Sequence, residues 1–282
     1  MFSRSTPYND TRGYGIGHSR TFKDDTYRLT ALLVDTTVNA TYYVADFPFE
    51  FSLDGTVAFA RLKRRFGDSN MFIGASTSVL DASINFPLSP GPESASGPGI
   101  PEVPFTDVGI SASFIYDSRD DTMMPTTGHL ADLSLWRYDE AFGGDYNYTS
   151  TTLKVNSFRV FGKKWVLGLR LEASAANGDM PFYAAPYVKL RGIPALRYQG
   201  EMAGAVEVEL RYQFAKHWAV LGFLGEGFTD ERGLWDETED EIKAYGVGFR
   251  WLALPTKNVW VGLDLARGPE DDFFYIQLVH PW

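Results

Sequence analysis

The residue with the clearest chemical potential is Arg191, which is bounded by Gly192 and Pro194 and precedes a stretch that carries Glu207 and Glu209. A guanidinium held in such a loop can fold back onto the acidic stretch and form a charge-assisted, bidentate hydrogen bond with a carboxylate. We therefore predict that Arg191 contacts one of these acidic side chains. The alternative is an arginine in solvent, where an ion pair contributes little free energy.

A second charged segment contains Tyr116, Asp117, Arg119, Asp120 and Asp121. Carboxylates this close together can bind calcium. A charged turn capped by Arg119 is the commoner explanation, and it needs no metal.

The remaining polar residues indicate no catalytic or cofactor chemistry. The sequence has no cysteine, which excludes thiolate chemistry and cysteine-ligated zinc. The segment Gly13-x-Gly15-x-Gly17 has neither the preceding strand nor the following helix of a dinucleotide loop. The histidines are scattered without the spacing of a metal site: His18, His129, His217 and His280. We predict a protein that is not an enzyme and that binds no cofactor or metal.

The elements that position these residues repeat with period two. In 165–172, 206–213, 244–251 and 259–266, apolar residues alternate with charged residues and glycines. A helix would repeat every three or four residues, and none of these segments does so. Each is therefore predicted to be a β-strand with one apolar face and one face of charges and glycines.

Two classes of β protein have such strands. A soluble sandwich buries its apolar faces between sheets, whereas a transmembrane barrel turns them to lipid and its charged faces to a wet lumen. The apolar faces here end in Trp, Tyr and Phe, which is typical of the aromatic girdles at the two bilayer interfaces. On alternation alone the soluble alternative stays open, including a soluble β protein that binds an apolar ligand.

The charge balance narrows the range of partners. The 282 residues include 36 acidic and 26 basic side chains, which gives a formal charge of −10. This balance argues against a nucleic-acid partner, because binding phosphates requires a clustered excess of Lys and Arg. No apolar run reaches the roughly eighteen residues of a transmembrane helix.

The spacing of the strands favours a barrel. Short connections alternate with a class of mostly longer ones, as expected for short periplasmic turns and longer extracellular loops. We predict an all-β, antiparallel transmembrane β-barrel that forms a single domain over 1–282, with 177–202 as a long extracellular loop that folds into the lumen. Thirteen strands are visible and Phe2–Thr6 could be the stub of another, so the count is about fourteen. The expected strands are 12–22, 25–44, 49–65, 70–86, 105–117, 128–141, 145–161, 164–176, 203–214, 217–229, 242–253, 258–267 and 272–282.

Two motifs carry a family resemblance. At Leu190-Arg191-Gly192-Ile193 and at Tyr116-Asp117-Ser118-Arg119-Asp120, the sequence resembles the BamA/TamA family of outer-membrane proteins, the bacterial surface antigen superfamily. That family carries a Val/Leu-Arg-Gly-aromatic motif in a long extracellular loop, followed by a strand with an inward Glu. Ile193 stands where the family usually has an aromatic residue. The resemblance covers about residues 12–282 and ends in a strand finishing in Trp282.

The resemblance implies more than the residues alone. It implies Glu209 as the partner of Arg191, with Asp230 or Glu231 as a second partner. It also implies a barrel of sixteen strands, so the first two or so are absent here, or the barrel is smaller. The periplasmic POTRA domains of the family's translocases are not expected in this chain.

The function implied by the resemblance is outer-membrane assembly, or transport of protein or lipid, in a Gram-negative cell outer membrane. The expected partners are outer-membrane lipid, lipopolysaccharide, and a substrate polypeptide or lipid. The alternative is a passive pore or structural barrel without translocase activity.

Overall fold

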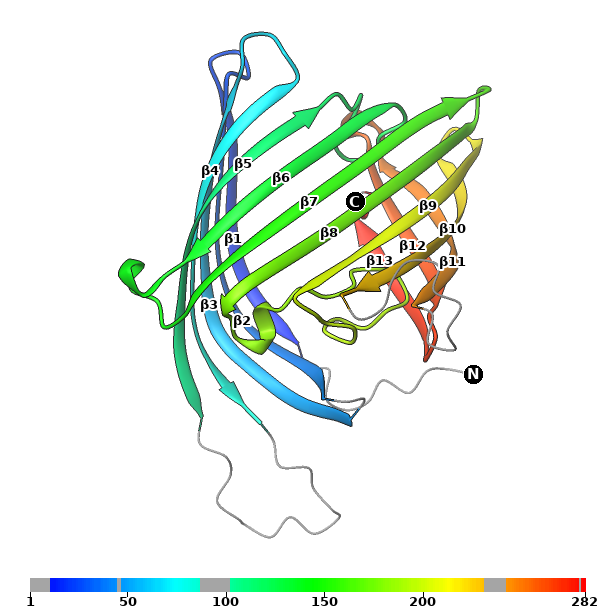
Figure 1. Ribbon diagram of the computed structural model, residues 1–282. Helices are drawn as coiled ribbons and strands as arrows, with labels where there is room; N and C mark the ends of the chain where they lie inside the picture. The colour runs from blue at the N-terminus through cyan, green and yellow to red at the C-terminus, as the bar shows by residue number, and fades with distance from the viewer. Residues whose placement is uncertain (1–10, 45–46, 87–101, 231–241, 279) are drawn as a thin grey trace.

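The computed structural model describes residues 11–44, 47–86, 102–230, 242–278 and 280–282. Thirteen antiparallel strands form one sheet, in which each strand pairs with its neighbours in the chain (Figure 1). The strands are β1 (Arg12–Phe22), β2 (Tyr27–Val44), β3 (Phe47–Arg65), β4 (Met71–Asn85), β5 (Val103–Asp117), β6 (Gly128–Tyr138), β7 (Asn147–Phe161), β8 (Trp165–Asp179), β9 (Met202–Ala215), β10 (Trp218–Thr229), β11 (Lys243–Leu254), β12 (Val259–Arg267) and β13 (Asp272–Leu278). The described connections contain three single-turn 3-10 helices: η1 (Glu140–Phe142), η2 (Phe182–Ala184) and η3 (Pro255–Lys257). The described residues contain no helix long and apolar enough to cross a membrane.

The predicted antiparallel all-β fold is confirmed, and most strand ends agree with the predicted ranges within a few residues. The clearest difference is the last strand, which was expected to reach residue 282 but ends at Leu278. The described part of the chain contains thirteen strands, and Phe2–Thr6, considered above as the stub of a further strand, lies outside it.

The alternation of residue types produces the two faces of the sheet. In β9, Glu207, Glu209 and Arg211 are buried on the concave face, while Val208 and Leu210 are exposed on the convex face. Side chains of successive residues point to opposite faces of a strand, so the same division follows in the neighbouring strands. The convex face therefore presents an apolar band to lipid, and the concave face surrounds a lumen.

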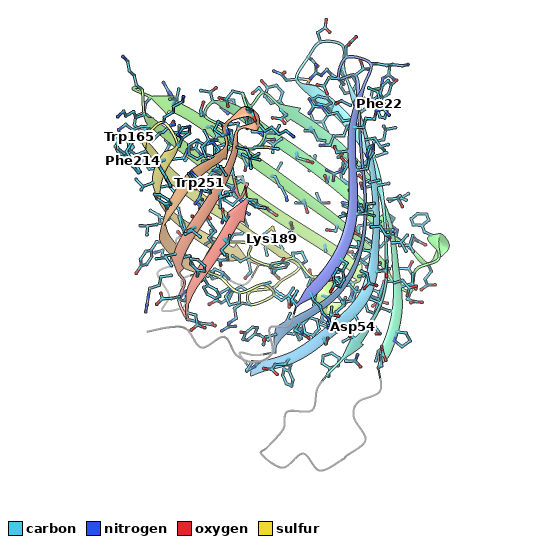
Figure 2. The ribbon with its side chains drawn as sticks, turned by 180° about the vertical axis from the view of Figure 1, so that it is seen from behind. Phe22, Asp54, Trp165, Lys189, Phe214 and Trp251 are labelled. Atoms are coloured by element: carbon cyan, nitrogen blue, oxygen red, sulfur yellow. The ribbon has the colours of Figure 1, made fainter. Side chains whose placement is uncertain are left out.

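Aromatic side chains gather at the end of the sheet that carries the short turns. The rings of Trp165 and Tyr212 lie 4.5 Å apart between centroids, and those of Trp218 and Trp251 lie 6.0 Å apart. Figure 2 shows Trp165, Phe214 and Trp251 at this end, on the same side as Phe22. Aromatic residues at this height form the girdle of the periplasmic interface.

The strands β2 and β3 are longer than a membrane requires. They contain 18 and 19 residues, whereas a transmembrane strand needs about 9–11 residues. Both project beyond the apolar band at the end opposite the short turns, where Asp54 lies in Figure 2. The outward side chain of Asp54 accepts a hydrogen bond from Thr37 at 2.5 Å there, so this part of the convex face is polar.

The two edges of the sheet are β1 and β13. Within the described residues, β1 pairs only with β2, and β13 pairs only with β12. Two side chains of the β1 edge, Tyr14 and Ile16, are largely exposed. The sheet curves strongly (Figures 1 and 2), and among the described residues β1 and β13 do not pair with each other.

The connection between β8 and β9, residues 180–201, packs inside the curve of the sheet against both walls. Phe182, Tyr183 and Leu196 belong to an apolar cluster with inward side chains of β3–β5. Val188, Leu190 and Ile193 belong to a second cluster with inward side chains of β9 and β11. We call this connection the inner loop.

Candidate functional site

The backbone of the inner loop turns sharply beside Arg191. Gly192 has φ +96°, a region that favours glycine. A β-carbon at this position would lie 3.1 Å from the Ala244 side chain and 3.2 Å from the backbone of Arg267. Gly192 therefore lets the loop approach β11 and β12 closely enough for Arg191 to reach the wall. The Gly192 N–H donates to the hydroxyl of Tyr275 in β13 at 3.0 Å.

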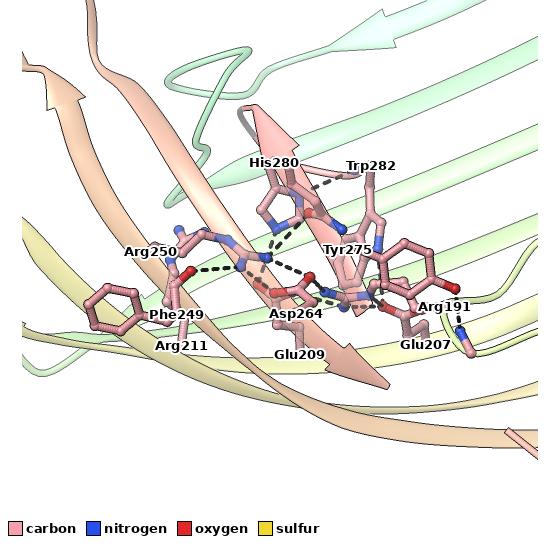
Figure 3. Close-up of polar contacts among 12 residues, drawn as sticks. Arg191, Glu207, Glu209, Arg211, Phe249, Arg250, Asp264, Tyr275, His280 and Trp282 are labelled. Atoms are coloured by element: carbon pink, nitrogen blue, oxygen red, sulfur yellow. Dashed lines mark hydrogen bonds and ion pairs between the residues drawn. The ribbon is translucent and has the colours of Figure 1, made fainter. Parts of the chain in front are cut away.

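The guanidinium of Arg191 lies against three carboxylates (Figure 3). Its Nε donates to Glu207 Oε1 at 2.9 Å, and its terminal nitrogens donate to Glu209 Oε2 and Asp264 Oδ2, each at 3.0 Å. The Arg191 side chain is 7% exposed. Its guanidinium also lies 3.7 Å from the centre of the Phe223 ring, which adds a cation–π contact. The predicted contact between Arg191 and Glu209 is thus present, together with two further carboxylates.

Asp264 joins the inner loop to the wall. It accepts hydrogen bonds from Arg191 and, through both oxygens, from Arg250 of β11, which is fully buried. Gly248 and Gly262 flank this pair, and a β-carbon at Gly262 would lie 2.7 Å from an Arg250 nitrogen. The glycines of the concave face therefore provide the space in which the arginines lie across the strands.

His280 and Trp282 lie in the lumen, which corrects the prediction that the last strand continues to Trp282. His280 Nε2 lies 3.1 Å from Glu209 Oε1, and the Trp282 indole N–H donates to Glu207 Oε1 at 3.1 Å. The Trp282 ring also packs against Phe158 and over Gly168. The physical reason is that β13 ends at Leu278 and that Pro281 has no N–H with which to continue the ladder.

The charged segment after β5 forms a structured turn. Arg119 donates from Nε to Asp117 Oδ1 at 2.9 Å. Asp120 accepts hydrogen bonds from the Thr126 hydroxyl at 2.5 Å and from the backbone N–H groups of Thr126 and Thr127. Burial raises the pKa of Asp120, but these hydrogen bonds outweigh burial and hold the pKa below its ordinary value. Each carboxylate is therefore bound within the turn.

This turn also contacts the opposite wall. Arg211 of β9 donates to the Pro125 carbonyl at 2.5 Å and lies 3.3 Å from the sulfur of Met124. The Met123 carbonyl accepts from the backbone N–H of His280 at 2.7 Å. The turn 118–127 thus folds across the periplasmic end of the lumen, which explains why it is longer than the other turns at that end.

The other residues predicted for the site lie apart from Arg191. Tyr116 is in the outward register of β5, opposite to that of Asp117. Asp230 accepts a hydrogen bond from the backbone N–H of Met202 at 3.4 Å. Among the described residues, Arg191 forms ion pairs with Glu207, Glu209 and Asp264, so Asp230 is not the second partner that was predicted. Glu231 lies outside the described residues.

The inner loop also links the two edges of the sheet. Arg197 donates from Nε to Glu270, in the connection between β12 and β13, at 2.5 Å. Its guanidinium lies 4.5 Å from the centre of the Tyr43 ring in β2. Arg197 therefore bridges strands next to the two edges, at the extracellular end.

The sequence interpretation missed Asp264 and Arg250 as members of the network. Both lie in segments whose alternation was recognised, Leu263-Asp264-Leu265 and Phe249-Arg250-Trp251, so their inward direction could be read from the pattern. The pairing of Asp264 with Arg191, which lies 73 residues away in the inner loop, could not be read from the pattern.

Comparison with known proteins gives a family and a fold. An Omp85 superfamily domain matches residues 99–188. BamA from Haemophilus ducreyi lacking POTRA domains 1–3 superposes with a TM-score of 0.62 at 12% identity, over 96% of this chain and 62% of that chain. CdiB from Acinetobacter baumannii superposes with a TM-score of 0.63 at 12% identity, over 96% of this chain and 51% of that chain. A search of curated proteins finds no match.

This chain spans 62% and 51% of the lengths of those two structures, and at 12% identity the likeness concerns the fold. The superfamily match covers less than half of the chain, and it includes strands β5 to β8 and the first part of the inner loop. The predicted location in the outer membrane is confirmed. Residues 99–188 are similar to an Omp85 superfamily domain, and the chain has an antiparallel β-barrel fold similar to those of BamA and CdiB.

Proposed function

We propose that this barrel acts in outer-membrane assembly, or in transport of protein or lipid, and that it is neither a passive pore nor an enzyme. The observation that carries the proposal is the inner loop, fixed by Arg191 to Glu207, Glu209 and Asp264 inside a sheet whose edge strands are unpaired on their outer sides among the described residues. A structural barrel would need neither feature.

The inner loop argues against a wide aqueous pore. Porins leave an open channel through the lumen. Here the loop packs against both walls near the extracellular end, and the turn 118–127 contacts β9 at the periplasmic end. Free diffusion through the barrel would have to pass both segments.

The unpaired edges favour a role in handling extended chains. An edge strand presents unpaired N–H and C=O groups that can pair with an added strand. In a bilayer such groups are costly unless they are satisfied. Edge strands β1 and β13 therefore offer a place where a substrate polypeptide could add a strand, or where lipid or lipopolysaccharide could approach the lumen.

The proposal is tested by reconstituting the barrel in vesicles of phospholipid and lipopolysaccharide. An unfolded outer-membrane β-barrel is added, and its folding is followed by heat-dependent gel mobility. We expect faster folding than in empty vesicles, and slower folding with R191M than with the exposed-turn control K163M. No acceleration by the intact chain, combined with large and steady conductance, would favour the passive pore.

A further inference from the structure

A cavity lies between the inner loop and the inner face of β13. Its volume is about 510 Å³, which lies within the roughly 300–1,000 Å³ range of small-molecule sites. One part of its lining is cationic and another part is apolar. The lining includes Arg170, Lys189, Ile193, Phe273, Tyr275 and Trp282.

The cationic part has more positive charge than its carboxylates neutralise. Glu172 pairs with Arg170 at 2.8 Å, with Lys189 at 3.3 Å and with Lys154 at 3.6 Å. Arg170 also approaches Glu207 at 3.9 Å, but that carboxylate already binds Arg191. Three cations therefore share Glu172, and only Arg170 has a second, more distant carboxylate in Glu207, within a chain whose formal charge is −10.

The two lysines are available to a ligand. The side chain of Lys154 is 49% exposed and that of Lys189 is 40% exposed, whereas that of Glu172 is 8% exposed. Ion pairs this exposed contribute little free energy, so their rearrangement around a ligand costs little. Figure 2 shows Lys189 within the curve of the sheet, beside β13.

The apolar part of the lining belongs to an edge of the sheet. Phe273 and Tyr275 of β13 stack with ring centroids 6.2 Å apart, and Ile193 of the inner loop lines the same cavity. Because β13 pairs only with β12 among the described strands, an alkyl chain on these rings lies next to an unpaired edge.

We propose that this cavity binds a single-chain anionic amphiphile. The acidic headgroup pairs with Lys189, Arg170 and the neighbouring Lys154, and the alkyl chain lies on Phe273 and Tyr275. Carboxylate and phosphate headgroups share the chemistry that the three cations recognise. The proposed site does not depend on the assembly or transport role, because the residues that form it are the same whichever substrate the barrel handles.

The test uses the full chain in a neutral maltoside detergent. The added probe is dodecyl phosphate that carries bromine at the end of its alkyl chain. Bromine quenches the fluorescence of Trp282 on contact. Probe in the micelle also quenches the outward tryptophans, and this background is the same in all variants. The matched comparison is K154Q/K189Q against K163Q/K216Q, which removes two exposed lysines from turns outside the cavity. Heat-dependent gel mobility checks that each variant is folded.

We expect the half-saturating probe concentration to rise about tenfold in K154Q/K189Q and to stay unchanged in K163Q/K216Q. E172Q, which removes the competing carboxylate, should bind the probe more tightly. Equal quenching in the two double variants, or equal affinity for brominated dodecanol, would overturn the proposal. Displacement of the probe by equimolar inorganic phosphate would also overturn it, because the site would then bind free phosphate. The substrate-folding assay is scored separately, so failure of one proposal is distinguishable from failure of the other.

Discussion

The side chains of Arg191 and Asp264 are 73 positions apart in the chain and 3.0 Å apart in the barrel. Asp264 also binds Arg250, so one carboxylate holds the inner loop to two neighbouring strands. Since all three side chains are buried, each charge depends on the others for its compensation.

Loss of the Arg191 guanidinium should undock the inner loop. Removing one partner of a buried ion pair costs roughly 3–5 kcal/mol, because the remaining charges are left uncompensated. We expect R191M to lower the free energy of unfolding in urea and to expose the inner loop to protease. R191K should be intermediate, because an ammonium cannot reproduce the forked hydrogen bonds. Unchanged protease resistance in R191M, relative to the control K163M, would show that the apolar clusters alone hold the loop.

Loss of the Arg197 side chain should loosen the edges of the sheet more than it lowers the overall stability of the barrel. A partly exposed ion pair and a cation–π contact together contribute about 1 kcal/mol, which corresponds to about a fivefold change in an opening equilibrium. We expect R197M to increase hydrogen exchange in β13 by about that factor and to leave β6 and β7 unchanged. An equal increase in all strands would indicate general destabilisation.

The turn after β5 should respond to pH through Asp120. Its folded-state pKa lies below the ordinary value, so its hydrogen bonds stabilise the barrel at neutral pH. That contribution is complete above the unfolded-state pKa of about 4 and is lost as the pH falls through the folded-state pKa. We expect D120N to unfold at lower urea than the parent chain at pH 7, with the difference shrinking below pH 4. The exposed-turn variant D68N should show no such convergence.

Backbone amide hydrogens of the edge strand β13 should exchange with solvent faster than those of the interior strands β9 and β11. Strand β13 has seven residues and one described neighbour, whereas β9 and β11 are paired on both sides. We therefore expect amides of 274–278 to exchange faster than those of 206–213 and 244–251, as measured by mass spectrometry. Equal protection of the three segments would mean that the edge is paired in the membrane.

The inner loop should limit conductance. In planar bilayers we expect small or irregular currents from the intact chain, because the loop and the turn 118–127 obstruct the lumen. Replacing 182–199 with a short Gly/Ser linker should increase the current. A large, steady current before the deletion would contradict the obstruction.

Much of the fold follows from local pattern, because period-two alternation and turn spacing depend on neighbouring residues. The contact of Arg191 with Glu209 was predictable for a similar reason, since Gly192 and the acidic face of β9 are both visible in the chain. The contact of Arg191 with Asp264 was not predictable, because it depends on how far the sheet curves. The last strand was wrongly expected to reach Trp282; Pro281 has no N–H to continue a ladder, and the strand ends at Leu278.

The inner loop also constrains the order in which the barrel can form. Its contacts extend from Tyr43 in β2 to Glu270 near the last strand, so its final position does not exist until the C-terminal strands are in place. Contacts between such distant parts of a chain form late, because they require the closure of long segments. Docking of the loop would therefore be the last event of biogenesis, and a barrel arrested before it would carry three buried acids without their arginine.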